Sequence, residues 1–243
     1  MAPDRSSHGT IAVVGNDPDR YAETLSGFGL GAEDLAAWLE SGLGDDAFED
    51  WLTDRIARRP RGTRAREVYG AEEVHDFARQ AILAALELEP GERLLEIGCG
   101  GRLLLRDAIA AGAVATGIDH SEEMVDLARE RAPGASVVLG KAESLPFADA
   151  AFDGVAMSIV FFFLDQPVGV LQECRRVLRP DGRVAVYTTA PELRGTPAAP
   201  EPLASRGHFY TDQELAGIAR RARLHDVAVR SDHGGQLLTA RAG

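Results

Sequence analysis

The sequence predicts an α/β protein whose core is a seven-stranded, mostly parallel sheet with helices on both faces, preceded by an N-terminal helical extension. Its 243 residues suffice for one such domain and a short appendage. From about residue 92 onward, β-rich runs alternate with helical patterns, which is typical of a parallel sheet wrapped by helices. Before that point the hydrophobic spacing is helical only, and two β-rich runs close the sequence.

Five β-rich runs are predicted to form the parallel strands: residues 93–97, 114–118, 136–139, 152–158 and 183–188. Helices are expected between them, from Leu103 to Gly112, after a cap at Ser121, and near residues 168–178. The Arg-Pro-Asp-Gly sequence of residues 179–182 predicts a turn into the fifth strand.

The end of the chain is predicted to add an antiparallel pair of strands. Residues 190–205 are rich in Pro and Ala and indicate a loop. Thr211 and Glu214 form a capping box that predicts the start of a helix. Residues 227–230 and 236–240 are the two predicted strands, and they bring the sheet to seven.

The N-terminal part is predicted to be helical. Trp, Leu and Ile recur at helical spacing in residues 32–40 and 47–56, and a longer helix is expected over residues 72–88. We predict that residues 1–66 form a lid or dimer arm and that residues 67–243 form the main domain. The Arg-rich residues 56–66 include Pro60 and Gly62 and indicate a linker, read either as a solvated connection or as an anion-binding patch.

Composition excludes several classes of function. The formal net charge of −12 argues against a nucleic-acid partner, which needs a dominant basic face. No apolar run approaches the roughly 18 residues of a membrane span, and the N-terminus lacks a signal-peptide pattern, so a cytoplasmic location is expected. Cys99 and Cys174 belong to no metal-binding spacing and are expected to be reduced, structural thiols, and no metal is expected.

The stretch LLEIGCGGR, which begins at Leu94, carries the central chemical signal. Gly98 and Gly100 follow a strand and precede a helix, where a tight turn needs positive dihedrals and a ligand can lie against bare backbone. Glu96 would repel the pyrophosphate of a dinucleotide, whereas it suits the ammonium and sulfonium groups of S-adenosylmethionine. Leu103 also stands where the dinucleotide fingerprint has its last Gly.

Asp119 ends the second predicted strand. A carboxylate there can accept hydrogen bonds from both hydroxyls of a ribose. Proteins that bind NAD use the same device, so Asp119 alone does not discriminate between cofactors. The alternative is that Asp119 extends the cap of the helix that starts after Ser121.

Together these stretches resemble the class I S-adenosylmethionine-dependent methyltransferases, particularly the small-molecule group related to the quinone-biosynthesis enzymes (methyltransferase type 11). The resemblance covers roughly residues 65–243. It rests on five stretches in order, LLEIGCGGR, TGIDHSEEMVDLARERA, GKAESLPFADAAFDGV, ECRRVLRPDGRVAVY and HFYTDQELAGIARRA. It implies a Rossmann-like fold, S-adenosyl-L-methionine as cofactor and methyl transfer to a small-molecule acceptor.

The resemblance also implies roles for single residues. Those around the glycine turn would hold the methionine end, those after the second and third strands the ribose and adenine, and one aromatic residue would fold over the cofactor. The implied cofactor-binding residues are Tyr69, Glu96, Gly98, Cys99, Gly100, Asp119, His120, Met124, Ala142, Glu143 and Ser158.

Three positions depart from the family pattern. Arg102 replaces a residue that is usually Gly, so it either shifts the helix start or offers a guanidinium to the cofactor carboxylate. Lys141 stands where an Asp often accepts from the adenine amino group, which an ammonium cannot do. Residues 161–163, three Phe, replace a pair of His; they are expected to face a core or lid, or otherwise to line the site of an apolar or aromatic acceptor from secondary metabolism.

A catalytic base is optional, because methyl transfer from a sulfonium requires no protonation of the leaving group. His208, His233 and Tyr210 are candidates by type and by their position in C-terminal loops. Each has a structural alternative, since a loop His is often a solvated residue and Tyr210 beside a capping box often packs as a staple.

Two other classes of function stay open on the residues alone. The first is a relative that binds S-adenosylmethionine without transferring methyl, as a site for another reaction or as a regulatory module. The second is a nicotinamide oxidoreductase, which Glu96 and Leu103 disfavour. A homodimer is a further expectation, through the N-terminal arm.

Overall fold

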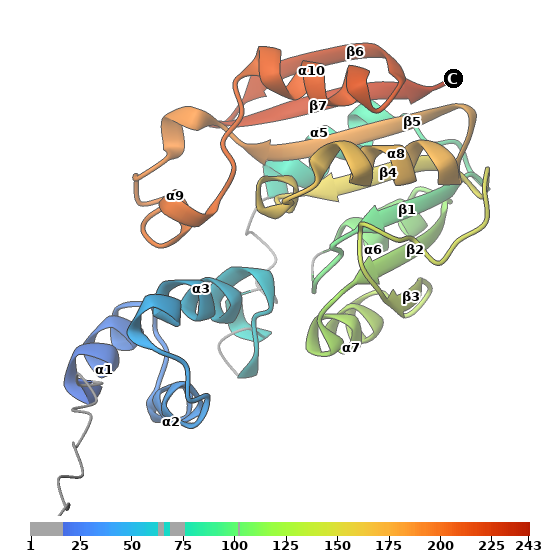
Figure 1. The fold of residues 1–243 in the computed structure, drawn as a ribbon. Helices are drawn as coiled ribbons and strands as arrows, with labels where there is room; N and C mark the ends of the chain where they lie inside the picture. The colour runs from blue at the N-terminus through green and yellow to red at the C-terminus, as the bar shows by residue number, and fades with distance from the viewer. Residues whose placement is uncertain (1–16, 63–65, 69–75, 102) are drawn as a thin grey trace, which may run out of the picture. The chain divides into compact units, whose positions relative to one another are not determined.

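The computed structural model describes residues 17–62, 66–68, 76–101 and 103–243 (Figure 1). The chain divides into two compact units, Met1–Trp51 and Leu52–Gly243. Tyr69 and Arg102, which the sequence singled out, lie outside the described residues. No helix in the described part of the chain is both long enough and apolar enough to cross a bilayer.

The first unit is a set of short helices around an aromatic cluster. Trp38 is buried, and its ring centroid lies 5.0 Å from that of Phe48 and 5.4 Å from that of Tyr21. The helices are α1 (Pro18–Gly27), α2 (Ala32–Glu40), the 3-10 helix η1 (Asp45–Ala47) and the start of α3 (Phe48–Thr53). The sequence predicted α2 at these bounds, whereas α1 was not predicted.

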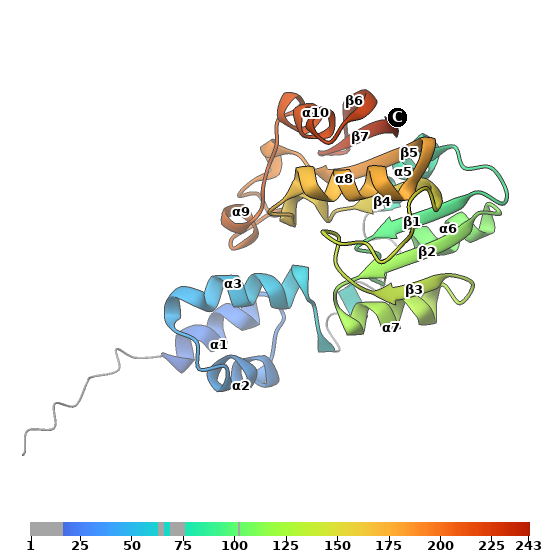
Figure 2. The same cartoon turned by 45° about the vertical axis from the view of Figure 1, so that its right-hand side comes forward.

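The second unit contains the seven-stranded sheet, in the order β3-β2-β1-β4-β5-β7-β6 (Figures 1 and 2). Strands β1 to β5 pair in parallel, and β7 runs antiparallel between β5 and β6. This confirms the predicted sheet. The strands are β1 (Arg93–Ile97), β2 (Val114–Asp119), β3 (Ser136–Leu139), β4 (Phe152–Ser158), β5 (Leu178–Thr189), β6 (Leu224–Asp232) and β7 (Gly235–Ala242).

Helices cover both faces of this sheet, and each face has its own hydrophobic core. One core contains buried residues of α8 (Pro167–Val177) and α10 (Asp212–Arg221). The other contains buried residues of α5 (Asp76–Leu86), α6 (Leu104–Ala110) and α7 (Glu122–Arg131). In Figure 1, α8 lies in front of β4 and β5, and α5 lies behind the sheet. The predicted capping box is present, since Thr211 Oγ1 accepts from Glu214 N and Glu214 Oε2 accepts from Thr211 N.

Two local predictions were wrong. Residues 179–182, predicted as a turn that precedes the fifth strand, belong to the first half of β5, where the register against β4 shifts and Asp181 adopts a φ of +61°. Residues 190–205, expected as a loop, contain the 3-10 helix η4 (Pro191–Leu193) and the four-residue helix α9 (Leu203–Arg206). The Arg-Pro-Asp-Gly sequence therefore makes an irregularity within a strand, because neighbouring residues on both sides pair with β4.

The segment before α5 is attached to α7. It starts with the π-helix η2 (Asp54–Arg58). The backbone N–H of Gly62 lies 3.1 and 3.0 Å from the two carboxylate oxygens of Glu123, and Arg66 forms an ion pair with Glu130 at 2.9 Å. The guanidinium of Arg66 is thus paired with a carboxylate of the main domain.

Candidate cofactor site

Three buried polar residues lie at the carboxyl ends of neighbouring parallel strands. Glu96 is the second-to-last residue of β1, Asp119 is the last of β2 and Ser158 is the last of β4. All three are buried. Successive side chains of a strand point to opposite faces of the sheet. The strand residues next to these three, such as Ile118, belong to the core that contains α8 and α10. The three polar side chains therefore share the opposite face, at the edge where open α/β sheets bind ligands.

The glycine turn after β1 depends on two left-handed residues. Gly98 has a φ of +67° and Gly100 a φ of +49°. A Cβ added to Gly98 would lie 2.5 Å from Cγ2 of Val160, so no side chain fits between this turn and the end of β4. At Gly100, which is buried, the nearest atom to such a Cβ is Sδ of Met124, at an ordinary contact distance of 3.9 Å. The turn therefore has no room for a side chain at its first glycine, whereas a Cβ at the second would make only an ordinary contact.

Asp119 connects the glycine turn to the start of α7. Its Oδ2 accepts the backbone N–H of Gly100 at 2.9 Å, and its Oδ1 accepts that of Ser121 at 2.9 Å. Burial raises the pKa of Asp119, and these backbone donors partly offset that rise. Each oxygen keeps a further lone pair that can accept from a ribose hydroxyl. Ser121 stands at the N-cap position, but its side chain makes no capping hydrogen bond.

Cys99 packs beneath the turn. It is fully buried, its backbone N–H donates to Ile118 O at 3.1 Å, and a Cβ added to Gly117 would lie 2.8 Å from its Sγ. Burial, followed by the negative charges of Glu96 and Asp119, raises the pKa of the Cys99 thiol well above its ordinary value. The side chain of Cys99 thus supports the turn from the protein side.

The residues predicted near adenine lie in the segments that follow β2 and β3. His120 is exposed, whereas Met124 of α7 is buried. Ala142 is half-buried and Glu143 is exposed, and both lie in the turn that Lys141 and Ser144 close by a β-bridge. Because β2 and β3 are paired, these two segments leave the sheet side by side. Lys141 is exposed, so its ammonium is not buried at the site.

The loop that contains Ala142 and Glu143 is held to α8 by Arg176. This guanidinium donates to Phe147 O at 2.7 Å and to Leu145 O at 3.0 Å. It also binds both carboxylate oxygens of Glu173 at 2.8 Å, and Glu173 Oε2 accepts the backbone N–H of Leu145 at 2.9 Å. The hydrogen bonds from Arg176 lower the pKa of Glu173.

The predicted base candidates lie in two places. His208 Nε2 lies 3.2 Å from Asp165 Oδ1, and the His208 ring stacks on Tyr210 with centroids 6.3 Å apart. His233 lies instead in the β6–β7 turn, where its ring stacks on Phe77 of α5 at 5.6 Å. His208 and Tyr210 are therefore brought together, and His233 contacts a different element.

The three consecutive Phe residues form the 3-10 helix η3 (Phe161–Phe163) directly after β4. Phe161 and Phe162 are buried, and Phe161 belongs to the α8 and α10 core, as the core alternative predicted. Phe163 is half-buried, and its ring lies 3.9 Å from that of Phe162. The ring centroid of Phe209 lies 5.9 Å from that of Phe162. The guanidinium carbon of Arg194 lies over the Phe209 ring, 5.7 Å from its centroid. An aromatic surface thus follows β4.

Sequence reasoning missed three residues of this region. Ile159 adopts a φ of +55°, which is a strained conformation for a β-branched residue, and its N–H donates to Tyr187 O at 2.9 Å. Val160 then packs on Gly98, and Asp165 contacts His208. Neither the strain nor these contacts has a local sequence signal, because each depends on residues distant in the chain.

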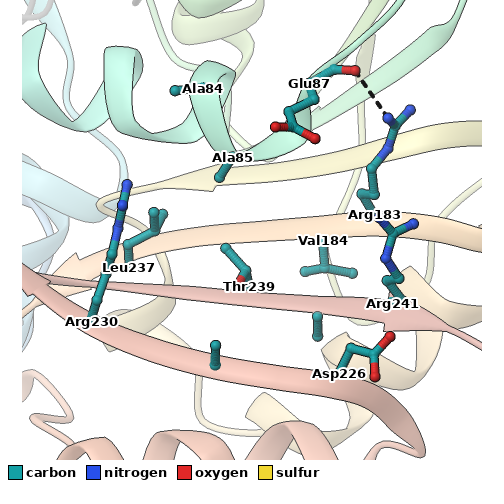
Figure 3. A pocket seen from close by; sticks show the side chains of 12 residues that line it. Ala84, Ala85, Glu87, Arg183, Val184, Asp226, Arg230, Leu237, Thr239 and Arg241 are labelled. Carbon is teal, nitrogen blue, oxygen red and sulfur yellow. Dashed lines mark hydrogen bonds between the residues drawn. The ribbon is translucent and has the colours of Figure 1, made fainter.

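A separate pocket of about 390 Å³ lies between α5 and strands β5, β6 and β7 (Figure 3). Arg183, Arg230 and Arg241 line it together with Glu87 and Asp226. Figure 3 shows Arg183 donating to the backbone oxygen of Glu87, at 3.0 Å. The pocket shares no residue with the predicted cofactor site.

Comparison with known proteins agrees with this geometry. Residues 95–186 match the family model described as a methyltransferase domain. A demethylmenaquinone methyltransferase of Beutenbergia cavernae is 38% identical over 115 residues, which are 46% of this chain and 48% of that protein. The 27-O-demethylrifamycin SV methyltransferase of Amycolatopsis mediterranei is 35% identical over 155 residues, 60% of this chain and 57% of that protein. The chain spans about half the length of these two curated relatives.

The fold is also found among solved structures. An S-adenosylmethionine-dependent methyltransferase of Thermotoga maritima, described as a possible histamine N-methyltransferase, aligns with a TM-score of 0.57 and 23% identity. The alignment covers 82% of this chain and 99% of that chain. At this identity the likeness concerns the fold, and it confirms the Rossmann-like architecture.

Proposed function

We propose, from the match of residues 95–186 to a methyltransferase domain, that this protein uses S-adenosylmethionine to transfer a methyl group to a small-molecule acceptor that is apolar or aromatic. The observation that carries the proposal is the hydrogen bond from Gly100 N–H to Asp119, which joins a buried carboxylate at the end of β2 to the glycine turn after β1. The predicted role in secondary metabolism, the cytoplasmic location and the absence of a nucleic-acid partner belong to the same proposal.

The described residues fit S-adenosylmethionine. Glu96 is buried on the same face as Asp119 and suits a cationic amino-acid tail, whereas the pyrophosphate of a dinucleotide would be repelled. A Cβ on Gly100 would approach Sδ of Met124 no closer than 3.9 Å, and Asp119 has lone pairs for a ribose. We assign Glu96, Gly98, Gly100 and Ser158 to the methionine end and Asp119 to the ribose. His120, Met124, Ala142 and Glu143 are assigned to the adenine.

S-adenosylmethionine supplies an electrophilic methyl group whose bonding electrons stay with the sulfur, so an acceptor hydroxyl gains the methyl and must lose a proton. The protein's contribution is to position the acceptor and to take up that proton. His208 lies beside η3, and we assign it the role of base. Burial, and next the charges of Asp165 and Glu214, raise the pKa of Tyr210, so its phenol stays protonated and suits hydrogen-bond donation.

The residues around η3 support an apolar or aromatic acceptor. Phe163 is half-buried, and Phe209 lies beside the same helix. Such rings bind aromatic molecules by offset or edge-to-face contacts. The name of the Amycolatopsis mediterranei relative describes methylation of an O-demethylated rifamycin, which favours a hydroxyl as the acceptor group.

Calorimetry with S-adenosylmethionine, S-adenosylhomocysteine and NADH tests the cofactor assignment. We expect both sulfur nucleosides to bind and NADH not to bind. A panel of aromatic and apolar hydroxyl compounds is then incubated with methyl-deuterated S-adenosylmethionine, and products are analysed by mass spectrometry. Binding without any labelled product across the panel would favour the relative that does not transfer methyl. No affinity for S-adenosylhomocysteine would overturn the proposal.

We further propose that the N-terminal helices act as a lid or as the arm of a homodimer. Their aromatic cluster around Trp38 gives them a core of their own. A lid predicts that S-adenosylhomocysteine slows hydrogen exchange in residues 17–51 without changing the molecular mass. An arm predicts twice the monomer mass in sedimentation equilibrium. If neither is observed, both roles are wrong.

A further inference from the structure

Asp165 and His208 meet beside η3, although they are 43 residues apart in the chain. The backbone N–H of His208 donates to Phe162 O at 2.6 Å, which places the backbone of His208 next to this helix. Asp165 follows the helix, and its Oδ1 lies 3.2 Å from His208 Nε2. Val160, at the other end of η3, packs on Gly98 of the cofactor turn. One short helical turn therefore separates the pair from the predicted cofactor site.

The contact with Asp165 determines which nitrogen of the His208 imidazole carries the proton. When His208 is neutral, a hydrogen bond to a carboxylate places the proton on Nε2, because Asp165 accepts and does not donate. Nδ1 then carries the free lone pair. The side chain of His208 is 44% exposed, so the imidazole is accessible to a bound molecule. A carboxylate that accepts from one nitrogen of an imidazole and orients the ring is the arrangement of histidine bases in general.

The other groups near His208 suit this role. Tyr210 stacks on the ring, and burial raises the pKa of its phenol, so it does not compete for the proton. Glu214 is exposed in the first turn of α10, and its carboxylate caps Thr211. Asp165 is therefore the carboxylate in contact with the imidazole among the described residues.

We propose that Asp165 is a positioning residue, which holds the proton of His208 on Nε2 so that Nδ1 takes the proton of a hydroxyl acceptor. This rests on the proposed methyl transfer and names the acceptor as a molecule whose reacting group carries a proton. The contact has little structural value, because the side chain of Asp165 is 89% exposed and exposed ion pairs contribute little to stability. Its variants should therefore fold.

Nitrogen NMR of ¹⁵N-histidine-labelled protein at a pH where His208 is neutral tests the positioning, since Nδ1 and Nε2 resonances differ between the tautomers. His208→Gln assigns the signals. We expect the Nε2-protonated form in the wild type, a mixture in Asp165→Ala, and recovery in Asp165→Asn, whose amide oxygen still accepts. His225 lies 3.3 Å from Asp226 on the surface, so Asp226→Ala is the matched control and should leave His208 unchanged.

Kinetics with a hydroxyl acceptor from the panel then test the consequence. Asp165→Ala should lower kcat about 10-fold with little change in KM, and His208→Gln should lower it about 100-fold. An unchanged tautomer in Asp165→Ala overturns the inference, as does an unchanged kcat. The NMR spectra are recorded without S-adenosylhomocysteine. A failure of cofactor binding would therefore contradict the proposed function, whereas the tautomer of His208 could still be determined.

Discussion

The backbone N–H of Gly100 donates to Oδ2 of Asp119 at 2.9 Å, so the carboxylate that ends β2 also holds the turn that follows β1. The same carboxylate accepts from Ser121 through its other oxygen. One buried side chain thus organises the two backbone segments that we propose to bind the cofactor, and this makes Asp119 the first position to test.

Asp119→Asn should weaken binding of S-adenosylhomocysteine by at least about 10-fold, equivalent to about 1.4 kcal/mol. An amide has one accepting oxygen, so it cannot serve Gly100, Ser121 and both ribose hydroxyls. Calorimetry measures the change. Asp126→Asn, on the exposed side of α7, is the control and should bind as the wild type does. Equal affinity of the two variants would remove Asp119 from the ribose site.

Gly98→Ala should destabilise the protein by about 1–3 kcal/mol more than Gly91→Ala. Both glycines have positive φ, but a Cβ on Gly91 meets nothing within 4 Å, whereas one on Gly98 would lie 2.5 Å from Val160. The difference isolates the close approach from the backbone conformation. Urea denaturation measures it, and Val160→Ala in the Gly98→Ala background should recover part of the loss. Equal effects at both glycines would show that the turn can move away from β4.

Arg176→Ala should lower the free energy of unfolding by about 1–3 kcal/mol, because Leu145 O and Phe147 O lose their donor and Glu173 its partner. Arg220→Ala, on the exposed side of α10, is the control. The difference in the free energy of unfolding between the wild type and Arg176→Ala should depend on pH. The pKa of Glu173 is lowered in the folded protein, so its contribution is present above the ordinary value of 4.5 and is lost as the pH falls through the lower folded value. Denaturation curves at pH 7 and pH 3 test this, and a constant difference would contradict it.

Neither Cys99 nor Cys174 should react with a thiol reagent in the folded protein at pH 8. Both are buried, and burial raises the pKa of both thiols. The reactive species is the thiolate, so protection follows from both access and protonation. Titration with Ellman's reagent should find no fast thiol before denaturation and two afterwards. Rapid labelling of Cys99 in the native protein would show that the glycine turn opens.

The parallel strands could be predicted closely because β-rich runs and glycine or proline boundaries are local signals. Arg93–Ile97 and Phe152–Ser158 were predicted at the bounds that the structure has. Helix α1 was not predicted, since Tyr21 and Leu25 are its only buried residues and so give too short a stripe. The capping box of Thr211 was predictable because both its residues lie within one helical turn.

In the candidate site, too, some residues could be predicted from the sequence and others could not. Glu96, Asp119 and the glycines of the turn follow strands, so their common edge follows from the topology of a parallel sheet. Asp165 could not be predicted, because its contact with His208 depends on how the chain returns to η3 after β5. The strain at Ile159 is likewise invisible in the sequence, since tertiary contacts impose its dihedral angle.

The insertion of β7 between β5 and β6 has a consequence for biosynthesis. Residues 235–242 leave the ribosome after all the other strands of the sheet, yet they lie inside it, between β5 and β6. Until they emerge, β5 presents a bare edge with unsatisfied backbone groups, and such edges invite association with other nascent chains. The growing polypeptide is thus most vulnerable to aggregation in the interval just before this segment is translated.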